Sequence, residues 1–208
     1  MARAKLAAPE AHLIKACDGM AKVVRGHQPF PTQRDDPTGP YEALFRAIIF
    51  QQLSGKAAQT IYNRVIALFP RHPHPTPLQI IRAQEEKLRG AGLSRQKIAA
   101  LKDLAAKRQS GLVPAMGEIE HLSDNEIIER LVAVRGVGRW TVEMYLIFTL
   151  CRPDVLPIDD LGVRKGAEKM FARSFTPKEL AAFGERWAPF RSAAAWHLWR
   201  VMDTKTPD

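Results

Sequence analysis

Apolar residues along this chain recur at intervals of three and four positions, and no segment alternates convincingly with a period of two. This pattern predicts a protein that is helical almost throughout. Clusters of proline and glycine at 28–40 and 70–77 interrupt it, because proline cannot continue a helix. The apolar sets that predict helices are Leu44, Ile48 and Ile49; Ile61, Val65 and Leu68; Ile98, Leu101, Leu104 and Ala105; Ile127, Ile128, Leu131 and Val132; Leu180, Phe183 and Trp187; and the run 193–202.

The length of 208 residues is sufficient for one compact body or for two closely packed lobes. Hydrophobic residues make up 46% and charged residues 25%, which is close to a globular average and excludes a disordered chain, a fibre and a coiled-coil rod. The proline-rich segment 28–40 is the best candidate for a crossing between lobes. We expect residues 1–39 to help close the second lobe.

The charge balance is basic, with 31 Lys and Arg against 22 Asp and Glu, a net charge of +9. Such an excess favours solubility and attracts polyanions. The stretch 87–108 concentrates it, with Asp103 as the one acidic residue that lies between its basic residues. Two interpretations stay open: a surface for a phosphate backbone, or a solvated helix face. The basic residues of this stretch are Lys87, Arg89, Arg95, Lys97, Lys102, Lys107 and Arg108.

Several classes of protein are excluded or disfavoured. The longest apolar run, Met144–Cys151, is far shorter than the roughly 20 residues that cross a bilayer, and the N-terminus lacks a signal-peptide pattern. We therefore expect a cytoplasmic protein with no membrane partner. Cys17 and Cys151 are too few for a four-thiolate metal site, and we interpret both as buried free thiols. His72 and His74 share a loop without a third ligand, so no transition-metal site is expected.

A helical hairpin is predicted near the middle of the chain. Ser123 and Glu126 form a capping-box signature that opens an apolar helical run. The run stops at the glycines Gly136 and Gly138, and helical periodicity resumes at Trp140. Glycines at the start of a second helix suit the binding of one phosphate, although a plain turn between helices gives the same pattern.

The hairpin segment Leu131–Tyr145, together with Leu156–Lys165, resembles the helix-hairpin-helix DNA glycosylase superfamily. Three further segments, Tyr41–Ala58, Leu88–Lys97 and Phe190–Arg200, look like its DNA-3-methyladenine glycosylase II branch, the AlkA and Mag type. The resemblance runs in order from about residue 40 to about residue 203. It implies an all-α, two-lobed helix-hairpin-helix glycosylase fold in its compact form, without an additional N-terminal β-domain. The helix-hairpin-helix lobe would span about 40–150, and the second lobe 1–39 plus 151–208.

The resemblance implies a monofunctional glycosylase that hydrolyses the N-glycosidic bond of alkylated purines, such as 3-methyladenine and 7-methylguanine, for base excision repair. Asp160 matches the family's catalytic aspartate and Asp159 its structural neighbour. From spacing alone, one of these acids would cap a helix N-terminus and the other would lie in the first turn of that helix. Trp140 stands where the lyase-competent branch places its lysine, so no Schiff base is expected. Lys165 is a possible substitute, but a solvated helix face suits it better.

The resemblance also implies residues for recognition of the base. Trp140 and Trp199 match aromatic positions that line the alkylpurine pocket, where indole faces can stack on a cationic base. A core position is an equal alternative for Trp199. Leu161 and Met144 depart from the better-known members and imply a more aliphatic pocket. The remaining helical tryptophans, Trp187 and Trp196, are expected in the core.

The implied partner is damaged double-stranded DNA, bound by a monomeric protein that would associate with the nucleoid if bacterial. The hairpin residues Gly136, Val137, Gly138 and Arg139 would bind the backbone. Gln52 or Leu53 would fill the gap left by the flipped base, although a polar connection between helices explains that segment equally well. No cofactor is required, but the hairpin could hold Na⁺ or K⁺. The carbonyls implied for such an ion are those of Val132, Val134 and Val137.

Three alternatives remain at this stage. One is a bifunctional glycosylase-lyase that acts on oxidised bases, and it would need an amine nucleophile. Another is a non-catalytic helix-hairpin-helix module that binds duplex DNA in a salt-sensitive manner. The third is a helical protein unrelated to nucleic acid.

Overall fold

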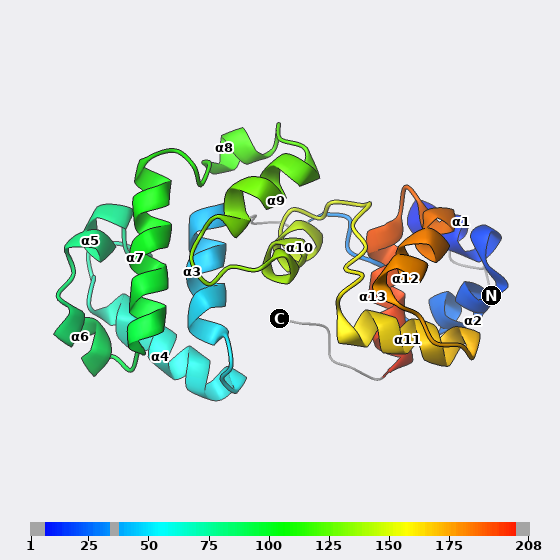
Figure 1. The fold of residues 1–208 in the computed structure, drawn as a ribbon, viewed down its shortest axis with the longest axis horizontal. Helices are drawn as coiled ribbons and strands as arrows, with labels where there is room; N and C mark the ends of the chain where they lie inside the picture. Colours follow the sequence, from blue (N-terminus) through cyan, green and yellow to red (C-terminus); the bar gives the residue numbers. More distant parts are fainter. Residues whose placement is uncertain (1–6, 34–37, 203–208) are drawn as a thin grey trace, which may run out of the picture. The chain divides into compact units, whose positions relative to one another are not determined.

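The computed structural model describes residues 7–33 and 38–202, and it confirms the all-α prediction for that part of the chain (Figure 1). The periodicity missed the helices before residue 27 and the short ones at 77–90. The helices, in chain order, are α1 (Ala8–Ala16), α2 (Asp18–Gly26), α3 (Pro40–Phe50), α4 (Gly55–Ala67), α5 (Pro77–Arg82), α6 (Glu85–Gly90), α7 (Arg95–Gln109), α8 (Met116–Ile119), α9 (Asp124–Val132), α10 (Arg139–Phe148), α11 (Leu161–Phe171), α12 (Pro177–Gly184), the 3₁₀ turn η1 (Glu185–Trp187) and α13 (Arg191–Val201).

The chain divides into two compact units. One unit comprises Asp36–Tyr145, and the other comprises Met1–Asp35 with Leu146–Asp208. The lobes expected from the sequence, about 40–150 and the remainder, follow nearly the same division. Of the expected crossing at 28–40, residues 34–37 lie outside the described residues, and the neighbouring positions 28–33 and 38–39 are not helical.

The unit 36–145 is organised around α7, which packs against α3, α5 and α6 (Figure 1). Ser94 begins α7 by accepting a hydrogen bond from the Lys97 N–H at 3.2 Å. Apolar residues at helical spacing on α3 and α7 form the centre of this core, as the sequence predicted. These buried residues are Leu44, Phe45, Ile48, Ile49, Ile98, Leu101, Leu104 and Ala105.

The second unit is organised around α13, whose buried residues include Ser192 and a run of three alanines, 193–195. Helix α11 packs closely against α13. A Cβ at Gly166 of α11 would lie 2.1 Å from the Leu198 carbonyl oxygen, so only glycine fits this crossing.

Residues 8–26 belong to the second unit, the lobe that the sequence expected them to help close. Helices α1 and α2 pack against each other and against α13. The buried Glu10 carboxylate accepts a hydrogen bond from the Phe30 N–H at 2.8 Å and lies 3.5 Å from His197 Nε2. These contacts attach the N-terminal segment to α13.

The cysteine interpretation was half right. Cys17 and Cys151 form no disulfide, but both are only partly buried rather than fully buried.

Candidate active site and nucleic-acid interface

Asp160 caps the N-terminus of α11 and is 9% exposed. Its Oδ1 accepts hydrogen bonds from the Val163 N–H at 2.7 Å and from the Trp199 indole N–H at 2.8 Å. The cap predicted from spacing is confirmed. The carboxylate is therefore fixed at the N-terminal end of α11, where the positive end of the helix dipole lies. Asp159, beside it, is exposed.

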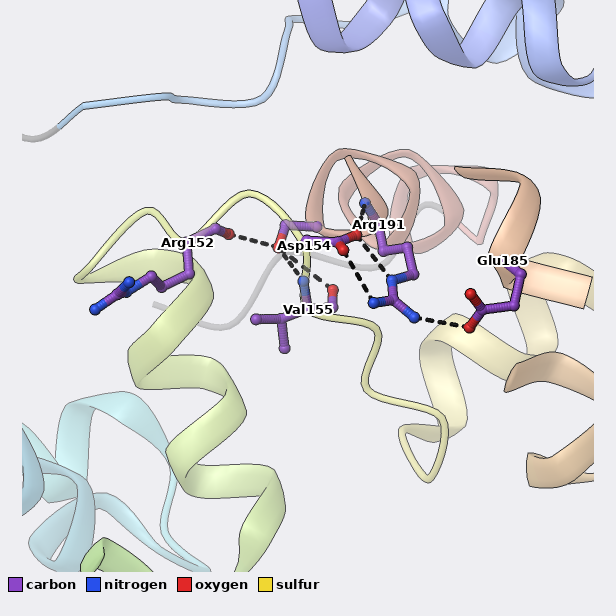
Figure 2. A network of polar contacts seen from close by, with 6 residues as sticks. Arg152, Asp154, Val155, Glu185 and Arg191 are labelled. Atoms are coloured by element: carbon purple, nitrogen blue, oxygen red, sulfur yellow. Dashed lines mark hydrogen bonds and ion pairs between the residues drawn. The ribbon is translucent and has the colours of Figure 1, made fainter. Parts of the chain in front are cut away.

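The segment that leads to Asp160 is attached to the N-terminus of α13 by a polar network (Figure 2). The Arg191 guanidinium donates to both carboxylate oxygens of Asp154, at 2.8 and 2.9 Å, and to Glu185 at 2.9 Å. The Ser192 hydroxyl accepts from the Val155 N–H at 2.9 Å. Helix α13 therefore holds the approach to Asp160 as well as the carboxylate itself.

Trp199 is 2% exposed, and its ring centroid lies 5.5 Å from that of Phe148. Its indole N–H points at Asp160, so the structure shows it to be a buried partner of the carboxylate. A Cβ at Gly162 would meet the indole at 2.7 Å, which explains a glycine there. Whether Trp199 also lines a base pocket stays a prediction.

Two tryptophans expected in the core differ from each other. Trp187 is completely buried. Trp196 is only partly buried, so a plain core role was wrong for it. Its indole N–H donates to the Gln28 carbonyl at 3.1 Å, and the Arg200 guanidinium lies 3.4 Å from a ring centroid.

The remaining predicted pocket residues keep accessible surface. Leu161, next to Asp160, is 61% exposed, and Trp140 is 45% exposed. Met144 is partly buried on α10. Lys165 lies on the exposed side of α11, where it pairs with Glu168 at 2.6 Å, in agreement with a solvated helix face.

The predicted hairpin joins α9 to α10, and its glycines have different functions. Gly136 has a φ of +77°, which a side chain would strain. A Cβ at Gly138 would meet nothing within 4 Å, so the fold itself leaves that surface open to a partner. Val137 is buried, and its N–H donates to the Val134 carbonyl at 3.0 Å. Its amide therefore closes the turn, contrary to the expectation that it would face DNA.

Arg139 begins α10 with its side chain 59% exposed. Its Nε donates to the buried Glu143 carboxylate at 2.9 Å. This pair fixes the position of the guanidinium at the first turn of the helix, where N–H groups have no acceptor within the helix. The hairpin can therefore present both a cation and helix-terminal amides to an anion.

The basic residues of the stretch 87–108 differ in their surroundings. Lys87, Arg89 and Arg95 are exposed and can meet a polyanion. Lys97 and Lys107 instead bind backbone carbonyls of the same unit, at 2.7–2.8 Å. Neither of the two open interpretations therefore describes the whole stretch.

The predicted wedge segment connects α3 to α4. Gln52 has a φ of +58° and is exposed, and Leu53 is 40% exposed. Ser54 ends the segment by capping α4, with its hydroxyl accepting the Ala57 N–H at 3.4 Å. The segment thus presents one polar and one apolar side chain outward, and the wedge role stays a prediction.

In the part of the chain that the structure describes, no helix is long and apolar enough to span a membrane. Within residues 7–33 and 38–202, no three His, Cys, Asp or Glu side chains gather as metal ligands.

The described residues offer two chemical capabilities, one in each unit. A fixed, nearly buried carboxylate can stabilise a developing positive charge. An open glycine turn at a helix start can bind a phosphate.

Known proteins are similar to this chain in sequence. The HhH-GPD superfamily base excision DNA repair protein family matches residues 45–190. DNA-3-methyladenine glycosylase 1 of Schizosaccharomyces pombe is 43% identical over 173 residues, which cover 82% of this chain and 76% of that protein. The alkylbase DNA glycosidase-like protein mag2 of the same organism is 33% identical over 195 residues, 92% of each chain.

Solved structures also match. The S. pombe 3-methyladenine DNA glycosylase in complex with abasic DNA superposes with a TM-score of 0.82 at 39% identity, and the match covers 97% of this chain and all of that one. These similarities extend over both units and include the segments that carry Asp160 and the hairpin. The chain belongs to the HhH-GPD superfamily of base excision DNA repair proteins.

Proposed function

We propose that this protein is a monofunctional DNA glycosylase that hydrolyses the N-glycosidic bond of alkylated purines, of the 3-methyladenine and 7-methylguanine type, in double-stranded DNA. The observation that carries the proposal is the Asp160 carboxylate, which is held at the head of α11 by the Val163 N–H and the Trp199 indole. The names of the two S. pombe relatives, a DNA-3-methyladenine glycosylase and an alkylbase glycosidase-like protein, support the substrate class.

The chemistry follows from the charge of this group. Cleavage of an N-glycosidic bond leaves positive charge on the sugar, and a fixed carboxylate stabilises that charge and can orient the attacking water. An alkylated purine is cationic and leaves readily, so no strong general acid is needed. The exposed indole of Trp140 offers a face for cation–π stacking on such a base. Leu161 and Met144 would add apolar contacts.

The hairpin would hold the DNA backbone beside the lesion. The open surface at Gly138 allows a phosphate to approach the start of α10, and Arg139 adds positive charge there. Gln52 or Leu53 would fill the gap in the base stack. Since one chain supplies all these groups, we propose that it acts as a monomer.

An alkali cation at the hairpin is part of the proposal. The carbonyls of Val132 and Val134 lie at the C-terminal end of α9, where partial negative charge gathers. The Val134 carbonyl accepts one hydrogen bond, from Val137, and a carbonyl has two lone pairs. Na⁺ or K⁺ on these oxygens and that of Val137 would add positive charge near a bound phosphate. Duplex affinity should then be higher in KCl than in tetramethylammonium chloride of equal ionic strength.

The test of the reaction compares wild type with Asp160→Asn on methylated duplex DNA. Asparagine caps helices as well as aspartate does, and its carbonyl oxygen can accept both hydrogen bonds, so the fold should persist. We expect release of free methylated base to fall by about 100-fold or more, because the charge is lost. Asp159→Asn is the matched control and should retain activity.

Two results would overturn the proposal. Equal base release by wild type and Asp160→Asn would remove the carboxylate from the mechanism. A covalent protein–DNA adduct trapped by borohydride would show an amine nucleophile, and hence a lyase.

A further inference from the structure

One face of α7 contacts both loops that the proposed function assigns to DNA. The residues of this face are Lys97, Ala100, Asp103 and Lys107, whose spacings of three, three and four residues place them in one row. Lys97, Asp103 and Lys107 each bond to a segment far away in the sequence, and Ala100 faces Gly136, where an added Cβ would lie 3.6 Å from its methyl group. All of these residues lie within the unit 36–145. We call these four residues the α7 row.

The N-terminal end of the α7 row binds the wedge segment, the connection between α3 and α4. The Lys97 ammonium donates to the carbonyl oxygens of Ile49 at 2.7 Å and of Gln51 at 2.8 Å. These carbonyls lie at the C-terminal end of α3, where a positive charge is favourable. The lysine therefore fixes the backbone one residue before Gln52, the first candidate for the wedge.

The C-terminal end of the α7 row binds the hairpin between α9 and α10. Asp103 accepts a hydrogen bond from the Arg135 N–H at 2.7 Å, and Lys107 donates to the Ala133 carbonyl at 2.7 Å. Burial raises the pKa of the Asp103 carboxyl, but the hydrogen bonds from Arg135 and Lys107 outweigh it and hold this pKa below its usual value. Asp103 thus stays ionised at neutral pH and keeps its hydrogen bond to the hairpin backbone.

Gln51 connects the two loops directly. Its side-chain amide donates to the Gly136 carbonyl at 2.9 Å, across 85 residues of sequence. The φ of Gly136 is +77°, and the methyl group of Ala100 would lie 3.6 Å from a Cβ there. The backbone of Gln51 is therefore held by α7 while its side chain holds the hairpin.

We propose that Gln51 is a positioning residue for base flipping, one that fixes the wedge segment relative to the hairpin. This rests on the proposed function, in which the hairpin holds a phosphate and Gln52 or Leu53 enters the base stack. A wedge can stabilise the flipped state only if it stands at a set distance from the phosphate held beside it. The Gln51 amide supplies that constraint without touching the DNA itself.

The test uses Gln51→Met, which keeps the length of the side chain and removes the donor. A neutral hydrogen bond contributes about 0.5–1.5 kcal/mol, so single-turnover base release should fall by about two- to twelvefold. Affinity for undamaged duplex, which depends on the hairpin, should stay within about twofold. Gln59→Met is the matched control, because the Gln59 amide bonds only to Asn63 on the same exposed helix face, at 2.7 Å.

A second measurement follows the wedge itself. In a duplex with an abasic site and 2-aminopurine in the opposite strand, insertion of the wedge should change the fluorescence. Gln51→Met should reduce this change, whereas Gln59→Met should not. Lys97→Met loosens the same segment, so its effect and that of Gln51→Met should be less than additive in the double variant.

Unchanged base release and unchanged fluorescence in Gln51→Met would overturn the proposal. A slower base release would also overturn it if affinity for undamaged duplex fell by the same factor, or if the melting temperature fell strongly. Either result indicates a merely structural role. Failure of the proposed function would appear differently, as absence of base release by the wild type. The fluorescence measurement would still test the position of the wedge in that case.

Discussion

Replacement of Gly166 by alanine tests the idea that the close approach of α11 and α13 positions the carboxylate of Asp160. A Cβ at Gly166 would lie 2.1 Å from the Leu198 carbonyl oxygen and 2.7 Å from the Leu198 carbonyl carbon. Ordinary contact begins at 3.4 Å, so the helices must separate locally by 3.4 − 2.1 = 1.3 Å. The obstacle is backbone, which cannot rotate away as a side chain can.

The magnitude follows from two opposing effects. Overpacking costs about 1–3 kcal/mol, and a backbone obstacle places this site near the upper end. Alanine is favoured over glycine within a helix by about 1 kcal/mol. We therefore expect the free energy of unfolding to fall by about 2 kcal/mol, which lowers the urea midpoint by about 1 M for a protein of this size.

The assay is urea unfolding, measured together with base release per folded molecule. Leu198 precedes Trp199, so a shift of this size should also break the 2.8 Å hydrogen bond to Asp160 and slow the reaction. Gly55→Ala is the control, because a Cβ at Gly55 would meet nothing within 4 Å. It should stabilise the protein by about 0.4–1 kcal/mol. A Gly166→Ala protein with the midpoint of wild type or higher would refute the reasoning.

Three further predictions concern the same unit. Trp199→Phe removes a hydrogen bond to a charged group, worth about 1.5–3 kcal/mol, so base release per folded molecule should fall by tenfold or more, and an unchanged rate would contradict this role. Ser192→Ala leaves a buried N–H without its acceptor and should lower the free energy of unfolding by about 1–3 kcal/mol, as measured with urea. Burial raises the pKa of the Asp154 carboxyl, but hydrogen bonds from Arg191 lower it overall, below the usual 3.8. Because the folded-state pKa is depressed, the ionised carboxylate stabilises the fold above the usual pKa, and this stability is lost as the pH falls through the folded-state pKa. The urea midpoint of wild type should therefore fall more steeply with acid than that of Asp154→Asn.

The sequence by itself determined the local features of this protein. Apolar spacing of three and four residues predicted the helices α3, α4, α7, α9, α12 and α13, because a helix buries one face and its period appears in the chain. The capping box at Ser123 and the glycines of the hairpin predicted where α9 begins and where the turn lies. Asp160 was found because a helix cap and the family motif fall on the same residue.

The tertiary structure alone decided which groups hold these features in place. Trp199 bonds to Asp160 across 39 residues, and Gln51 bonds to Gly136 across 85. Lys97 and Lys107 bind carbonyls of their own unit. From the charge pattern, a surface for a polyanion was one interpretation of the stretch that contains them. Periodicity and charge counts describe neighbours within a few residues. A hydrogen bond between distant segments depends on how helices cross, and crossing is fixed by packing contacts such as the one at Gly166.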